Sequence, residues 1–104
     1  MNTMTTSIVA AIAARDAFAA KIRSISTVID NLYVEGAAFD HMIDQDSNTV
    51  AVSVSAAYVG HWSLGWDSLT SARVARVSAA MAAAGLRHHD TGHAPGGVRL
   101  IFRA

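Results

Sequence analysis

The segment that most restricts the fold is residues 49–58, where two kinds of side chain strictly alternate. One set is apolar and larger: Val50, Val52, Val54, Ala56 and Tyr58. The other set is small: Ala51, Ser53, Ser55 and Ala57. A period of two predicts a β-strand. None of these residues is charged, and an exposed edge strand of this kind would aggregate, so we predict a central position in a sheet.

Three further runs predict the neighbours of this strand. Residues 38–44 form a strand with Phe39, His41 and Ile43 on one face, and the polar residues 45–48 make the turn of a hairpin. Residues 98–103 form a last strand. One face of this strand carries Val98, Leu100 and Phe102, and the other carries Arg99, Ile101 and Arg103. Directly before this last strand, residues 86–90 predict a short strand and residues 91–97 predict a loop.

The first helix is predicted over residues 5–29, with residues 31–36 as a connector that turns at Gly36. Its apolar residues recur at steps of three and four and share one stripe: Ile8, Ala11, Ile12, Phe18, Ala19, Ile22, Ile25 and Ile29. Arg15 falls within this stripe. Either its aliphatic stem lies at the margin of the stripe with the guanidinium in water, or it meets a carboxylate.

A second helix begins at Asp67, which is suited to be the N-cap, and ends at Gly85, which is suited to the left-handed position after a helix. The predicted buried residues of this helix are Leu69, Val74, Val77, Ala80, Met81 and Ala84. Leu86 follows the glycine as the apolar partner of a Schellman stop.

These elements predict one α+β domain over residues 1–104, in the order αββαββ. Two helices would cover one face of an antiparallel sheet of three to four strands. The alternation at Val50, Val52 and Val54 matches that from Val98 in phase, which suggests a duplicated αββ unit. The other sheet face would carry small residues with Arg99, Ile101 and Arg103.

Charge is scarce in this chain. Eight Lys and Arg balance eight Asp and Glu, and charged residues make up 15% of the sequence. The zero net charge argues against a protein that binds polyanions in bulk. A monomer of this mass exposes about 5,600 Å². The few charged side chains cover this area thinly, so some apolar surface is left exposed, and such patches are typical of partner contacts. We therefore predict a homodimer, formed through the second sheet face or through the alanine-rich flanks of the first helix.

No targeting or membrane-spanning segment is predicted. Residues 1–14 lack the basic start of a signal peptide. Residues 47–66 are uncharged except for histidine, but they include Asn48, His61 and two glycines, so a spanning helix is not expected. These observations predict a cytoplasmic protein without membrane contact.

The densest group of possible metal ligands is His88, Asp90 and His93. Imidazole nitrogens with a carboxylate suit zinc, so these three residues are the candidate metal ligands. The alternative is a polar loop that happens to be rich in histidine. No other cofactor is predicted, since the chain has no cysteine and no phosphate-binding glycine loop.

The catalytic motif that the sequence comes nearest to is the nucleophile elbow of serine hydrolases, with Ser63 of residues 60–65 in the place of the nucleophile. His61 stands where the nucleophile elbow needs its first glycine, and such hydrolases need a much larger sheet. No other acid–base pair is evident. We therefore predict that the protein is not an enzyme.

Aromatic side chains gather in residues 58–66 of a chain that is only 7% aromatic. Large aromatic residues in loops often anchor interfaces. The predicted partner-binding residues are Tyr58, His61, Trp62, Trp66, Arg99 and Arg103. For Trp66, packing beneath the second helix is the competing interpretation.

The sequence as a whole predicts a small protein-interaction module. One concrete form is an accessory protein or inhibitor encoded by a phage or mobile element that blocks a host defence complex, as an anti-CRISPR protein does. A first alternative is a nucleic-acid-binding domain that uses Ser53, Ser55, Arg99 and Arg103 on the open sheet face. A second alternative is a metal-binding protein that uses the loop from His88 to His93.

Overall fold

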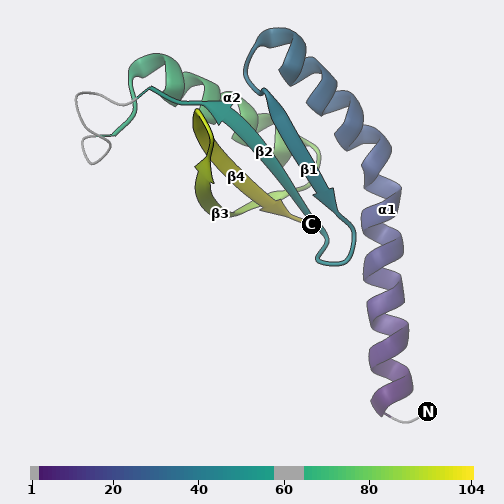
Figure 1. Ribbon diagram of the computed structural model, residues 1–104. Helices are drawn as coiled ribbons and strands as arrows, with labels where there is room; N and C mark the ends of the chain where they lie inside the picture. The colour runs from purple at the N-terminus through teal and green to yellow at the C-terminus, as the bar shows by residue number, and fades with distance from the viewer. Residues whose placement is uncertain (1–2, 58–64) are drawn as a thin grey trace.

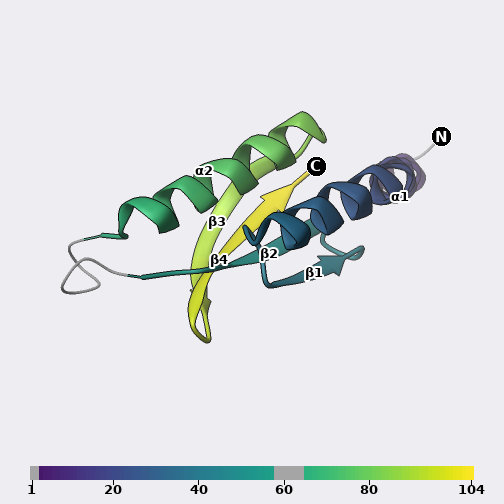
Figure 2. The ribbon, with the colours of Figure 1, turned by 90° about the horizontal axis from the view of Figure 1, so that it is seen from above.

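The computed structural model describes residues 3–57 and 65–104, so the predicted partner residues Tyr58, His61 and Trp62 lie outside the described residues. The elements are α1 (Thr3–Glu35), β1 (Asp40–Asp44), β2 (Thr49–Ser55), α2 (Ser68–Ala83), β3 (Arg87–Ala94) and β4 (Gly97–Arg103). This αββαββ order confirms the predicted α+β class. Both helices lie on one face of the sheet (Figures 1 and 2).

The four strands are antiparallel and follow the order β1-β2-β4-β3, so β2 is central as predicted. Strands β2 and β4 pair in the middle of the sheet, with Val52 opposite Leu100. The alternating residues on the helix-covered face are all buried: Val50, Val52, Val54, Val98, Leu100 and Phe102. The predicted division of these two strands into an inner and an outer face is therefore correct.

The core lies between this inner face and the helices. Helix α1 contributes Phe18, Ile25, Ile29 and Leu32, all of them buried, and α2 contributes Val77, Ala80 and Met81. Burial of one such large apolar side chain stabilises a fold by roughly 1.5–3 kcal/mol. A bidentate ion pair also joins the helices, because Arg76 donates from Nε and Nη2 to the Glu35 carboxylate, each at 2.8 Å.

Helix α1 continues to Glu35, so the predicted connector at residues 31–36 is wrong. Leu32 follows Ile29 by three residues and extends the buried stripe by one more turn. Gly36, with φ 76°, then ends the helix. The N–H of Ala37 donates to the Leu32 carbonyl at 2.9 Å, and that of Gly36 to the Tyr33 carbonyl at 3.1 Å, which together form a Schellman motif.

Helix α2 has the predicted ends. Asp67 Oδ1 accepts the N–H of Thr70 at 2.7 Å, and Gly85 has φ 85°. Leu69, which was expected in the core, is instead 55% exposed. Its neighbour Thr70 is buried, where its Oγ1 accepts the Ala57 N–H at 2.9 Å. The need to pair the Ala57 amide explains why a polar residue takes this interior position.

Strand β3 runs to Ala94, so the loop predicted at residues 91–97 is wrong. A bulge interrupts the pairing between His88 and Asp90, and the pairing with β4 then continues to Ala94 opposite Gly97. The bulge adds His89 to the strand and shifts the alternation by one residue. An alternation of faces that is continued through residue 89 therefore assigns the later residues to the wrong face of the sheet. For this reason the sequence did not predict the full length of the strand.

Gly97 is a position where the sheet has no room for a side chain. A Cβ there would overlap the Val54 carbonyl oxygen and stand 3.0 Å from the Phe39 ring. We expect Gly97→Ala to lower the free energy of unfolding by about 1–3 kcal/mol, as overpacking does. Gly92→Ala is the matched control, since nothing lies within 4 Å of its Cβ. Urea unfolding measures both, and equal effects would contradict the steric explanation.

The N-cap of α2 gives the stability a pH dependence. The hydrogen bond from the Thr70 N–H holds the pKa of the Asp67 carboxyl below its usual range. A lowered folded-state pKa contributes stability above the unfolded pKa, and that contribution is lost as the pH falls through the folded pKa. We expect wild type to exceed Asp67→Ala in stability at about pH 7, with the gap narrowing towards about pH 3. A gap in urea unfolding that does not change with pH would contradict this.

Candidate functional site

Two surfaces of the described residues lack a covering layer, and the first is the open face of the sheet. Three rows of its side chains cross all four strands, each written in the order β1, β2, β4, β3, and a fourth row, Ser55–Gly97–Ala94, crosses only β2, β4 and β3. The three full rows are Asp44–Thr49–Arg103–Arg87, Met42–Ala51–Ile101–Asp90, and Asp40–Ser53–Arg99–Gly92. Both helices lie on the opposite side, as Figure 2 shows.

The charges on this open face are divided by strand. Asp40 and Asp44 lie on β1, whereas Arg99 and Arg103 lie on β4 and Arg87 lies on β3. Within residues 3–57 and 65–104, the Glu35–Arg76 pair is the one ion pair found, so none of these three arginines has an acidic partner there. Arg87 and Arg103 are direct cross-strand neighbours, an arrangement of like charges that is unfavourable.

The middle of the open face is flat and only weakly polar. Ala51 and Ser53 on β2 are small, and Ser53 is buried among its neighbours. Met42 is 62% exposed, and Ile101 is half-buried. The face therefore has an acidic edge on β1, a flat strip along β2 and a basic half on β4 and β3, where Asp90 is the one acidic exception within the three rows.

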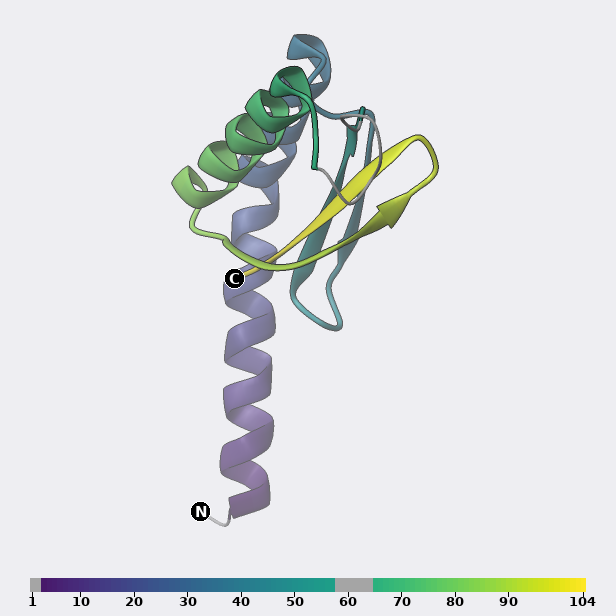
Figure 3. The ribbon, with the colours of Figure 1, turned by 90° about the vertical axis from the view of Figure 1, so that its left-hand side faces the viewer.

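The second uncovered surface is the free end of α1, by which we mean its residues from Ser7 to Ala13. This part of the helix runs past the strands (Figures 1 and 3). Phe18 is the first α1 residue in the core. Ile8, Val9 and Ile12 are each more than half exposed. The sequence has no charged side chain before Arg15, so this end is both apolar and uncharged.

The single apolar stripe predicted for α1 is wrong in its first half. At about 100° per residue, Ile12 lies roughly 120° around the helix axis from Phe18. Ile8, Ile12 and Ala19 are therefore exposed, on a different side from the core residues. Arg15 is also exposed and lies beside the turn between β1 and β2, where it lines a shallow cavity with Asp46.

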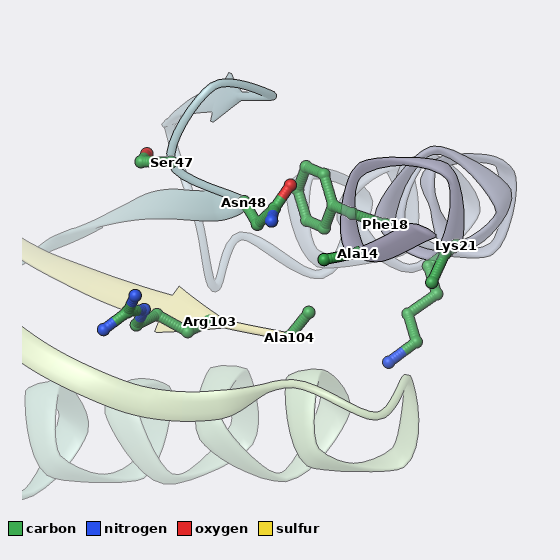
Figure 4. A pocket seen from close by; sticks show the side chains of 8 residues that line it. Ala14, Phe18, Lys21, Ser47, Asn48, Arg103 and Ala104 are labelled. Atoms are coloured by element: carbon green, nitrogen blue, oxygen red, sulfur yellow. The ribbon is translucent and has the colours of Figure 1, made fainter. Parts of the chain in front are cut away.

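A larger cavity of about 330 Å³ marks the place where α1 leaves the rest of the protein (Figure 4). Its lining includes Phe18, Lys21, Asn48 and Arg103. Lys21 Nζ donates to the Gly85 carbonyl at 3.3 Å, which ties α1 to the end of α2. The buried Oδ1 of Asn48 has no hydrogen-bond partner among the described residues.

The three candidate metal ligands do not lie together. His88 and His93 pair with Phe102 and Val98, whose side chains are on the inner face, whereas Asp90 pairs with Ile101 on the open face. His88 packs edge-on against the Phe102 ring, with the ring centroids 5.8 Å apart, and its Nε2 is 2.8 Å from Thr91 Oγ1. The described residues contain no group of three metal-ligating side chains. Metal binding stays an untested prediction.

The predicted partner-binding residues fall into three groups. Arg99 and Arg103 share the open face, as expected. Trp66 is half-buried and packs against the core, which supports the competing interpretation for this residue. Tyr58, His61 and Trp62 are not described. Sequence analysis missed Asp40, Asp44 and Arg87, because only the strand register reveals that they share a face with the other two arginines.

A hydrogen bond at the edge of the sheet also escaped sequence analysis. The Tyr33 hydroxyl lies 2.6 Å from His41 Nδ1, and the two rings meet edge-on. Desolvation and the nearby charge of Asp40 raise the pKa of Tyr33. This contact joins α1 to β1.

Comparisons with protein-family models, with curated proteins and with solved structures found no match for this chain. Among the described residues, no helix has the length and apolar character needed to cross a membrane.

The free end of α1 lacks the packing that stabilises the rest of the helix, and isolated helices shorter than about 12–15 residues are marginal in water. We expect Ala10→Pro to leave the thermal midpoint almost unchanged. The matched substitution Ser26→Pro lies between the buried residues Ile25 and Ile29 and should cost about 3 kcal/mol or more. Thermal unfolding followed by circular dichroism measures both. An equal loss for Ala10→Pro would show that the free end unfolds together with the core.

Proposed function

We propose that this protein is a small, non-enzymatic interaction module that binds a protein partner through the free end of α1. The observation that supports this most directly is the exposure of Ile8, Val9 and Ile12 on a helix that projects beyond the sheet. Exposed apolar groups of this size are typical of interaction sites. Ile8 and Ile12 are four residues apart, which is the spacing of anchors when a helix docks into a groove.

The chemistry of this helix favours a protein over a membrane or a nucleic acid. Helices that lie on anionic membranes carry Lys and Arg on their polar side. Here no basic residue precedes Arg15. Nucleic-acid backbones likewise require positive charge. An apolar groove in another protein needs no positive charge on the helix that enters it. Such a groove is therefore the binding site that fits this uncharged helix best.

A projecting helix on a compact domain can block or bridge a larger assembly. An inhibitor encoded by a phage or mobile element that blocks a host defence complex, as an anti-CRISPR protein does, is one concrete form of such a module. The domain packed around β2 and β4 would hold the helix, and the helix would fill a groove that the assembly uses for another contact. The support for this form is the projecting shape of α1 (Figure 3).

Nucleic-acid binding remains a second candidate, because Arg87, Arg99 and Arg103 share the open face without acidic partners in the described residues. Asp40, Asp44 and Asp90 lie on the same face and weaken it. If this function is correct, retention on single-stranded DNA or RNA falls with salt, and Arg99→Ala with Arg103→Ala lowers it. Equal retention of wild type and the double variant would contradict it.

Capture from a lysate of the source cells tests the proposed contact of α1. We expect Ile8→Glu with Ile12→Glu to abolish retention of the partner, because two charges then replace the apolar anchors. Ser7→Glu with Ala10→Glu is the matched control. It adds the same charge to the same helix at exposed residues that lie at least about 100° around the axis from Ile8, Val9 and Ile12. Mass spectrometry of the retained proteins measures the outcome.

Two results would contradict the proposed contact. In the first, wild type retains no protein that the isoleucine double variant loses. In the second, the isoleucine double variant and the control double variant lose the same protein equally, which would indicate that added charge, rather than the apolar anchors, decides retention.

A further inference from the structure

We propose that the open face of the sheet binds a second copy of this chain, face to face, about a two-fold axis that runs parallel to the strands. This inference concerns a different surface from the free end of α1, so it does not depend on the proposed function. It rests on the charges of the three rows, on the flat strip along β2, and on the area that the face offers.

The charges of the open face are complementary to themselves about this axis. A two-fold rotation about a line parallel to the strands places β1 of one copy above β3 of the other and keeps each row above itself. Asp44 and Arg87 are the two ends of one row. Asp44 of the second copy therefore lies above Arg87 of the first. On the other side of the axis, Arg87 of the second copy lies above Asp44 of the first.

The row of Asp40 gives a second pairing. Asp40 of the second copy lies above Gly92, which has no side chain and has open space at its Cβ position, and Arg99 is the next residue in that row. The arginine side chain is long enough to reach across one strand spacing of about 4.8 Å. Each aspartate of β1 thus meets an arginine that has no acidic partner within the described chain.

The same charges argue against the other axis. A two-fold axis perpendicular to the strands would place β1 above β1 and exchange the outer rows. Asp40 would then lie above Asp44, and Arg99 above Arg103. Both contacts join like charges, which suppress wrong arrangements at interfaces. The charge pattern therefore selects one face-to-face geometry.

The strip along β2 lets two sheets approach. Ala51 and Ser53 project little, and packed sheets lie about 10 Å apart. In the selected geometry Ala51 of one copy lies above Ile101 of the other, so a small residue meets a larger apolar one. Met42, which is 62% exposed, lies at the edge of the face above Asp90 of the other copy. These contacts remove apolar surface from water, while the aspartates and arginines at the sides fix the register.

The area of the face is close to the lower limit for a specific dimer. With about 3.4 Å per residue and about 4.8 Å between strands, a seven-residue strand such as β2 and four strands give a face of roughly 24 by 19 Å. Two such faces bury roughly 900 Å² in plan, and side chains that stand out of the plane add to this. The total approaches the lower end of the range for specific interfaces, about 1,200 Å².

A second copy fits this face better than a nucleic acid does. A polyanion would be attracted to the arginines and repelled by Asp40, Asp44 and Asp90. A second copy instead places arginines beside Asp40 and Asp44, and Asp90 lies above Met42. In the resulting four-layer dimer the helices form the two outer layers. Both free ends of α1 therefore stay accessible, so dimer formation and partner binding can be measured separately.

Light scattering of the full chain over a concentration series tests this inference. We expect wild type to approach twice the chain mass of 10.9 kDa. Arg99→Asp and Asp40→Arg should each weaken the dimer about tenfold or more, since each change creates two like-charge contacts. The double variant restores both pairings with the signs exchanged and should recover most of the dimer. Asp30→Arg, on the exposed side of α1, is the control for an added positive charge and should leave the dimer unchanged.

Three outcomes would overturn the inference. The first is a mass of 10.9 kDa at every concentration. The second is a dimer that neither single variant weakens, or one that the double variant fails to recover although circular dichroism shows it folded. The third is a dimer that is lost in Ile8→Glu with Ile12→Glu but kept in Arg99→Asp, because it would place self-association on α1. Loss of partner capture with an intact dimer would instead concern only the free end of α1.

Discussion

The pairing of β2 with β4 is the contact on which the rest of the structure depends. It joins the two αββ halves and places six buried side chains on one continuous surface, with Val52 opposite Leu100 at its centre. An uncharged strand such as β2 is stable in water only when both of its edges are paired. Because β1 and β4 provide those pairs, both helices have one common face to cover.

Within the part of the chain that the structure describes, two surfaces have no covering layer, and each arises from a mismatch. The sheet has two faces and the chain has two helices, which both pack on the inner one. Helix α1 is also longer than the sheet, since 33 residues span about 50 Å and a seven-residue strand spans about 24 Å. The excess helix projects, which accounts for the elongated shape of 59 × 28 × 20 Å.

The two surfaces differ in chemistry, and this difference suits them to different contacts. The free end of α1 is apolar and uncharged, so it offers binding energy without a preferred electrostatic orientation. The open sheet face has opposite charges on opposite sides, so it favours one orientation over others. The two proposed contacts are compatible with each other, because they use separate surfaces.

Local chemistry was enough for the sequence to determine the fold class, the central strand and both ends of α2. Period two at Val52 and Leu100, the N-cap at Asp67 and the left-handed Gly85 each act over a few residues. The rows of the open face, the bulge at His89, the burial of Thr70 in place of Leu69, and the exposure of Ile8 and Ile12 could not be predicted in this way. They depend on strand register and on which turns of α1 meet the sheet, and residues far apart in the chain decide these by packing together.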